Sequence, residues 1–182
     1  MIELNVESVI ETLASAQAFW AYIFLFALID STFAVGVVLS GLGTLAIATF
    51  GYTQGIIGLP EIAITAFFGA YLGDTLSFGF GRICAAGLAK RGHVSAQHAL
   101  TQKPTKLQVG VQKAQNGLAR FGPLFFIVGR WLPIASLLPA SYAVLGVPLR
   151  RFLALDALAC LIWVVGWCVI IFLGVKGVSV FA

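Results

Sequence analysis

The sequence predicts an all-α integral membrane protein with three spanning helices, two re-entrant helical hairpins that enter from opposite faces, and an N-terminal amphipathic helix. Three observations lead to this fold class. The 182 residues are 60% hydrophobic and 10% charged, and their mean hydropathy is +1.00, as in helical membrane proteins. Proline, glycine and charged residues interrupt two of the apolar stretches, and most basic residues fall in the middle of the chain. We treat residues 1–182 as a single membrane domain.

Residues 1–16 are expected to form an amphipathic helix on the membrane surface, because apolar and acidic residues each recur at helical spacing. The apolar run 18–50 would reach about 50 Å as one straight helix, whereas the hydrocarbon core is about 30 Å thick. We therefore divide residues 18–58 into a first span that ends near Asp30 and a first hairpin of two short helices.

Asp30 stands in apolar sequence and supports two interpretations. With Ser31 and Thr32 it can cap the start of the next helix. Alternatively, it exchanges a proton, because a carboxylate in apolar surroundings binds a proton more readily than one in water. The sequence does not decide between these roles.

Residues 59–89 are predicted to form a long span, because Pro60 and Glu61 suit a first helical turn. Small residues then recur at every fourth position and form a groove for close packing. We expect a hairpin to dock there, with a dimer contact as the alternative. Asp74 and Arg82 each follow a groove residue, and Asp74 is expected to be buried. The groove residues are Thr65, Gly69, Gly73, Ser77 and Gly81.

Residues 90–116 form the long polar segment and are predicted to lie in the cytoplasm. Between residues 75 and 155 the chain has ten lysine and arginine residues and no acidic residue, a bias that marks the cytoplasmic side. We extend this assignment to residues 90–120 and expect contact with anionic lipid headgroups rather than nucleic acid. His93 and His98 lack the spacing of a zinc site, so we expect neither a metal nor another cofactor.

Residues 117–148 are predicted to form the second hairpin. The stretch is apolar but contains three prolines and Arg130, so its helical pieces should be 123–132 and 139–147. Each piece would reach about 15 Å, half of the hydrocarbon thickness. An arginine at that depth costs about 3 kcal/mol or more unless it is paired or wetted. We therefore expect Arg130 to face a polar site; the alternative is that it snorkels or caps carbonyl groups at the break.

Residues 150–175 complete the domain as the last span. Trp163 and Trp167 share one face, and Asp156 either pairs with a neighbouring arginine or reaches the site. Read inward from each end, the chain gives a span followed by a hairpin, which is an inverted repeat. Secondary transporters often have this architecture, with the substrate site near the midplane where broken helices meet.

Three segments resemble the DedA family, whose membrane domain is also called the VTT or SNARE-associated domain. They are Asp30 within LIDSTFAVGVVLSGLG, the run GAYLGDTLSFGFGR at 69–82, and GRWLP at 129–133. The resemblance extends over about residues 18–173 and implies two opposed re-entrant hairpins. It also implies a role in membrane homeostasis through transport or flipping of lipid-phosphate carriers such as undecaprenyl phosphate. That transport could be proton-driven, and eukaryotic relatives are scramblases.

The sequence departs from this family pattern at two positions. Family members usually carry a second acid after a Leu-Pro-Gly turn in the first hairpin, where Leu42 stands here. They usually carry a further arginine six residues beyond the first, where Ser136 stands here. Losing one acid and one base together would preserve the charge balance, and it leaves proton coupling open.

These observations predict a transporter or flippase for a lipid-linked phosphate carrier or other anionic lipid in the bacterial cytoplasmic (inner) membrane. Arg130, with Arg82 and Ser136, would bind the phosphate, whereas Asp30 or Asp74 would exchange a coupling proton. The alternatives are an uncoupled phospholipid scramblase and a non-transporting membrane scaffold. We expect no enzyme, because the sequence contains no activated nucleophile, histidine–carboxylate set or metal-binding cluster. Membrane lipids are the expected partners, and homo-oligomerisation is left open.

Overall fold

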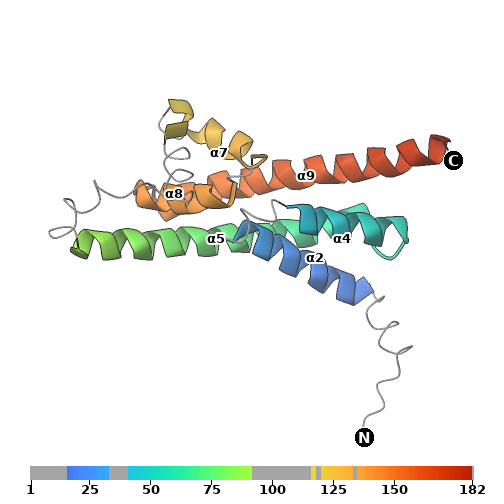
Figure 1. Cartoon of the computed structure of the whole chain (residues 1–182), viewed down its shortest axis with the longest axis horizontal. Helices are drawn as coiled ribbons and strands as arrows, with labels where there is room; N and C mark the ends of the chain where they lie inside the picture. Colours follow the sequence, from blue (N-terminus) through green and yellow to red (C-terminus); the bar gives the residue numbers. More distant parts are fainter. Residues whose placement is uncertain (1–15, 33–40, 92–115, 118–119, 133–134, 182) are drawn as a thin grey trace, which may run out of the picture.

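The computed structural model describes residues 16–32, 41–91, 116–117, 120–132 and 135–181. Within these ranges the regular structure is helical, as the sequence predicts (Figure 1). The amphipathic helix expected at 1–16 and most of the basic segment, including His93 and His98, fall outside the described residues. The helices are α2 (Ala16–Ser31), α4 (Leu42–Thr53), α5 (Leu59–Arg91), α7 (Pro123–Gly129), the 3₁₀ helix η1 (Ala135–Leu137), α8 (Leu138–Val144) and α9 (Leu149–Phe181).

The long helices α5 and α9 each have 33 residues, which corresponds to about 50 Å. Over Leu59–Gly87 and Leu149–Val175 they are long and apolar enough to cross a membrane. By contrast, α2 has 16 residues and reaches only about 24 Å, less than a typical hydrocarbon core. The last helix extends beyond its predicted end at residue 175, because no proline follows Pro148 to stop it.

The described residues place polar groups inside and many large apolar groups outside. Asp74 and Asp156 are 2% and 0% exposed, whereas Leu161 and Leu173 are 52% and 61% exposed. Exposure of so many apolar side chains is unfavourable in water but favourable in lipid. Together with the two long apolar helices, this distribution supports an integral membrane protein.

Figure 1 shows α5 and α9 running alongside one another, with α2 and α8 packed against different parts of α5. Near the first part of α5, a cluster that includes Phe19, Ile23 and Val164 joins α2, α5 and α9. Further along, the Phe78 and Phe152 rings stack with their centroids 4.2 Å apart and join α5 to α9. Two apolar clusters therefore flank the middle of the molecule.

The segment predicted to form the second hairpin is broken where the sequence predicts a break. Helix α7 ends at Gly129, and α8 begins at Leu138 after the short helix η1. Both pieces are shorter than predicted, because turns occupy residues 130–132 and 145–146. Of the predicted first hairpin the structure describes one arm, α4, which follows Gly41 at φ +78°; residues 33–40, where the other arm is predicted, lie outside the described residues. A positive φ is readily adopted by glycine.

The small-residue groove on α5 is filled by other parts of the same chain. A Cβ atom added to Gly69 or Gly73 would lie 2.5 Å from the carbonyl oxygen of Phe24 or Leu28 on α2. A Cβ atom on Gly81 would lie 2.7 Å from the carbonyl oxygen of Ala140 on α8. We predicted a hairpin as the occupant, but α2 takes most of the groove and the hairpin helix α8 takes its end. This intramolecular packing leaves no need for the alternative of a dimer contact at these glycines.

Replacing Gly69 with alanine should lower the free energy of unfolding by about 1–3 kcal/mol, because the new methyl group meets backbone that cannot move aside locally. Gly79→Ala is the matched control, since a Cβ atom there has nothing within 4 Å. It should leave stability unchanged or raise it by up to about 1 kcal/mol through helix propensity. Thermal unfolding in detergent, followed by circular dichroism, measures both. Equal melting temperatures for the two variants would contradict the packing of α2 in the groove.

Candidate functional site

Asp30 brings a carboxylate to the start of α4. It lies near the end of α2 and is 7% exposed. Its Oδ2 accepts hydrogen bonds from the Thr44 amide at 3.1 Å and from the Thr44 hydroxyl at 2.6 Å. Thr44 belongs to the first turn of α4, where free amide groups and the helix dipole favour an anion. Asp30 therefore acts as a helix cap, which is the first of its two sequence interpretations. The helix that it caps is α4, whose Thr44 is 14 residues away in the sequence.

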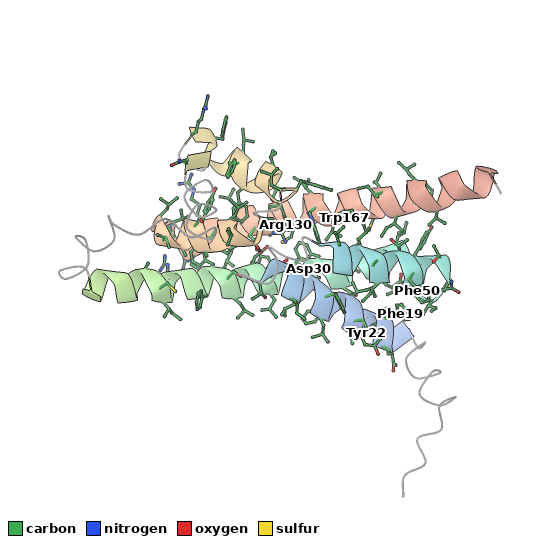
Figure 2. The ribbon with its side chains drawn as sticks, viewed as in Figure 1. Phe19, Tyr22, Asp30, Phe50, Arg130 and Trp167 are labelled. Carbon is green, nitrogen blue, oxygen red and sulfur yellow. The ribbon has the colours of Figure 1, made fainter. Side chains whose placement is uncertain are left out.

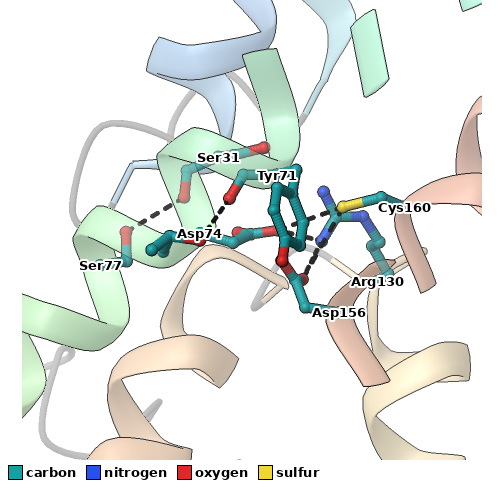
Figure 3. Close-up of polar contacts among 8 residues, drawn as sticks. Ser31, Tyr71, Asp74, Ser77, Arg130, Asp156 and Cys160 are labelled. Carbon is teal, nitrogen blue, oxygen red and sulfur yellow. Dashed lines mark hydrogen bonds and ion pairs between the residues drawn. The ribbon is translucent and has the colours of Figure 1, made fainter. Parts of the chain in front are cut away.

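Arg130 forms the centre of a buried polar cluster (Figure 3). It follows the last residue of α7, and its Nη1 forms ion pairs with Asp74 on α5 and with Asp156 on α9, the latter at 3.3 Å. The side chains of Arg130, Asp74 and Asp156 are 8%, 2% and 0% exposed. The Cys160 thiol lies 3.9 Å from Asp74 Oδ2 and 3.8 Å from Asp156 Oδ1. Three elements that are distant in the sequence thus meet at one guanidinium group.

The cluster has donor atoms at a spacing that a small cation could use. One atom each of Asp74, Asp156 and Cys160 lie within 4.8 Å of one another. However, Arg130 already contacts both carboxyl groups, so the cation of this cluster is its guanidinium group. Arg130 also lies over the ring of Trp163, with 5.4 Å from its Cζ atom to the ring centroid. These contacts make the cluster an ion-pair network centred on Arg130.

A cavity of about 190 Å³ lies beside this cluster. Figure 2 shows three of its lining residues, Asp30, Arg130 and Trp167, close together in the middle of the molecule. The cavity wall comes from α2, α5, α9 and both hairpins, so it forms only when these elements pack. Its lining residues are Asp30, Ser31, Gly41, Asp74, Arg130, Trp131, Leu132, Ala135, Ser136, Trp163 and Trp167.

Several polar atoms around the cavity have no hydrogen-bond partner in the part of the chain that the structure describes. They include a carboxylate oxygen, a guanidinium nitrogen, a hydroxyl oxygen and an indole nitrogen. Such buried groups are usually satisfied in proteins, by water if not by protein. Their number at one place indicates a site that receives water or a polar ligand. The atoms are Asp30 Oδ1, Arg130 Nε, Ser136 Oγ and Trp167 Nε1.

Three tryptophans line the same cavity, which the sequence analysis did not foresee. The ring centroids of Trp131 and Trp167 are 5.6 Å apart, and those of Trp163 and Trp167 are 6.1 Å apart. A signal was available on α9, because Asp156, Cys160, Trp163 and Trp167 are spaced by four, three and four residues and so share one helical face.

The predicted substrate-binding residues separate in the structure. Arg130 and Ser136 line the cavity, whereas Arg82 does not. Arg82 is exposed, and its Nη2 donates a hydrogen bond to the Val147 carbonyl oxygen at 3.1 Å. Leu42, at the first family departure, is 63% exposed and also lies outside the cavity lining. Arg82 is therefore not part of the site built around Arg130, because its position along α5 directs it to the end of the second hairpin.

The two predicted proton-coupling residues both line the cavity but have different partners. Asp74 is paired with Arg130, whereas Asp30 is bonded to the start of α4. The predicted groove residue Ser77 is buried, and its hydroxyl donates a hydrogen bond to the Ser31 carbonyl oxygen at 3.2 Å. The groove thus holds α2 in the position that brings Asp30 to the cavity.

The contact between Asp30 and Thr44 can be tested by a double-mutant cycle. Asp30→Ala should destabilise the protein by about 1–3 kcal/mol, because it leaves amide groups of α4 without an acceptor. Thr44→Val should cost about 1 kcal/mol through loss of the hydroxyl donor. If the contact exists, the double variant should be less destabilised than the sum of the two single variants. Strict additivity of the unfolding free energies in detergent would argue against it.

Comparison with known proteins supports the family suggested by the sequence motifs. A family model described as the VTT domain matches residues 31–173. Neither the curated proteins nor the solved structures include a significant match to the chain. The family match covers most of the chain, including α4, α5, both pieces of the second hairpin and the first part of α9. We conclude that the protein belongs to the VTT domain family, the membrane domain of DedA proteins.

Proposed function

We propose that this protein is a transporter or flippase that moves a lipid-linked phosphate carrier or another anionic lipid across the membrane. The observation that supports this function best is the buried cavity between the hairpins, where Arg130 Nε and Ser136 Oγ have no protein partner among the described residues. Both groups can donate a hydrogen bond to a phosphate oxygen. A guanidinium group suits such oxygens through its fork of donors.

The positions of the helices support a proposal for the membrane architecture. In this proposal α2, α5 and α9 are the three spans, and α4 and the α7–α8 segment belong to two re-entrant hairpins that enter from opposite faces. Helix α4 packs on α2, and α8 packs on α5 beyond it (Figure 1). The cavity between them would then lie near the midplane, as in inverted-repeat transporters. The segment 90–120 would face the cytoplasm, and the membrane would be the bacterial cytoplasmic membrane.

The size of the cavity favours a headgroup rather than a whole lipid. The cavity of about 190 Å³ is smaller than the roughly 300–1,000 Å³ typical of pockets that enclose drug-sized ligands. We therefore propose that it receives the phosphate group and not the whole lipid. Trp131 and Leu132 are 44% and 43% exposed at the edge of the cavity. The lipid chain would leave the cavity past these side chains and stay in the surrounding bilayer.

Two alternatives make different demands on the same residues. A scramblase would use the cavity without proton coupling, which the single guanidinium group and the departures at Leu42 and Ser136 would allow. A membrane scaffold would use the Arg130 ion pairs only for stability. The scaffold does not account for the unpartnered polar atoms of the cavity-lining residues, so we place it last.

Leaflet exchange of labelled lipid phosphate in liposomes tests the proposal. The full chain should accelerate exchange, and Arg130→Gln should reduce that acceleration at least about tenfold, because a lost charged hydrogen bond costs about 1.5–3 kcal/mol. Arg150→Gln is the matched control: Arg150 is exposed and lies outside the cavity lining. Arg82→Gln should behave like this control, although the sequence motifs predict a loss. Exchange no faster than in empty liposomes would remove the transport proposal, and exchange that ignores a pH gradient would favour the scramblase.

Ser136→Ala should change protein stability and the rate of lipid exchange in opposite directions. The Ser136 hydroxyl is buried without a hydrogen-bond partner among the described residues, so its removal should raise stability by up to about 1 kcal/mol. Exchange should nevertheless slow several-fold, because the substrate loses a donor. Melting temperature and exchange rate are measured on the same preparation. Faster or unchanged exchange would exclude Ser136 from the proposed binding site.

A further inference from the structure

The Arg130 cluster contains two carboxyl groups and one cation. Asp74 comes from α5, Asp156 and Cys160 come from α9, and Arg130 follows α7. Tyr71 of α5 lies beside Asp156 (Figure 3). Asp74 and Asp156 are almost completely buried. A buried carboxylate without a compensating charge is very unfavourable. The cluster is therefore neutral only when one of the two carboxyl groups carries a proton.

Asp30 does not change this charge balance. It lines the same cavity, but its negative charge already faces the Thr44 amide and hydroxyl groups at the start of α4. The positive end of that helix supplies the compensation. The surplus negative charge thus belongs to the pair Asp74 and Asp156.

The contacts distinguish the two carboxyl groups. Arg130 Nη1 approaches Asp74 more closely than Asp156, whose Oδ1 lies at 3.3 Å. The Oδ2 atom of Asp156 accepts no hydrogen bond from a described donor. One carboxylate oxygen of Asp74 and one of Asp156 lie within 4.8 Å of each other, so two negative charges there would repel each other. The closer ion pair keeps the charge on Asp74, and the proton belongs on Asp156.

We infer that Asp74 and Asp156 share one proton at neutral pH, that this proton resides mainly on Asp156, and that the pair is the proton-binding site of the protein. The sequence motifs instead pointed to Asp30 or Asp74. Asp74 lines the cavity, whereas Asp156 does not. A proton would therefore pass from a hydronium ion in the cavity to the Asp74 carboxylate, leave water behind, and move on to the neighbouring carboxylate of Asp156.

The consequence for transport rests on the proposed function. A phosphate at Arg130 Nε would bring negative charge to a cluster that is already neutral. A second proton on the Asp74–Asp156 pair would restore neutrality, so anion binding and proton binding would favour one another. By thermodynamic linkage the effect is reciprocal. Protonation of the pair at lower pH would raise the affinity for the anion by the same factor by which the bound anion raises the affinity for the proton.

Difference infrared spectroscopy on the purified full chain tests the proton site directly. At neutral pH the wild-type protein should show the C=O stretch of a protonated carboxyl group. The band should disappear in Asp156→Asn. It should also disappear in Asp74→Asn, because Asp156 must then ionise to pair with Arg130. It should persist in Asp30→Asn, the matched control. A band that survives in Asp156→Asn, or that is lost in Asp30→Asn, overturns the assignment.

Thermal unfolding of the same variants provides a second test. Each single variant leaves one carboxylate for Arg130, so its melting temperature should stay within about 4 °C of the wild type, the shift that accompanies a small change in stability. The double variant Asp74→Asn with Asp156→Asn leaves the guanidinium group unpaired and should melt far lower or fail to fold. If Asp156→Asn alone is as unstable as the double variant, Asp156 is ionised in the native protein and the inference is wrong.

The infrared and unfolding experiments need no transport, so they decide the proton site whether or not the proposed function holds. Coupling is tested separately in liposomes by the ratio of exchange rates with and without a pH gradient. The ratio should exceed one for the wild type and fall to one for Asp156→Asn. A ratio that stays above one in the variant, or exchange that stops altogether, would contradict the coupling but not the proton site.

Discussion

The ion pairs of Arg130 with Asp74 and Asp156 constrain the rest of the structure. A guanidinium group can be buried in an apolar molecule only where carboxylates from other elements reach it. The break after α7 places Arg130 at the end of a helix of only 7 residues, where its side chain turns inward between α5 and α9. The groove on α5 determines the position of Asp30. Gly69 and Gly73 allow α2 to approach α5 closely enough for Asp30 to reach the same cavity. Packing and charge burial therefore depend on one another.

The two charged sides of the cavity are stabilised in different ways. Asp30 faces amide groups at the start of α4, so its compensation is built into the helix itself. Arg130 is balanced by side chains, which can gain or lose protons. The family departures fit this division: Leu42 is exposed and does not disturb the Asp30 contact, whereas Ser136 leaves an unpartnered hydroxyl group beside the single guanidinium group that lines the cavity. A change of protonation would thus affect the Arg130 side more than the Asp30 side.

Local signals in the sequence were sufficient to predict much of the fold. Pro123 and Pro139 predicted the broken hairpin, Asp30 marked the end of α2, and the four-residue spacing from Gly69 to Gly81 located the groove. These features depend on backbone chemistry and side-chain size, which are readable residue by residue. The helix that fills the groove could not be predicted in this way, because a stripe of small residues does not specify which helix approaches it.

The composition of the site was harder to predict because it depends on long-range register. Asp156 is 26 residues from Arg130, and no local pattern shows that α9 presents it to the end of α7. Arg82 was predicted to help Arg130 hold the anion. It lies eight residues beyond Asp74, which is about 12 Å along the helix, and there the Val147 carbonyl group binds it instead. Sequence spacing thus identified the charged residues but not their partners.

In the proposed function, Arg130 presents its guanidinium fork to a polar cavity that binds an anionic headgroup. Tryptophan fluorescence measures this most directly, because Trp163 and Trp167 line that cavity. Titration of the detergent-solubilised protein with a short-chain lipid phosphate should give a saturable change in wild-type fluorescence. Arg130→Lys keeps the charge but loses the fork, and should need at least about tenfold more ligand for half-saturation. The same half-saturation in both proteins, with both still folded, would contradict a binding role for Arg130.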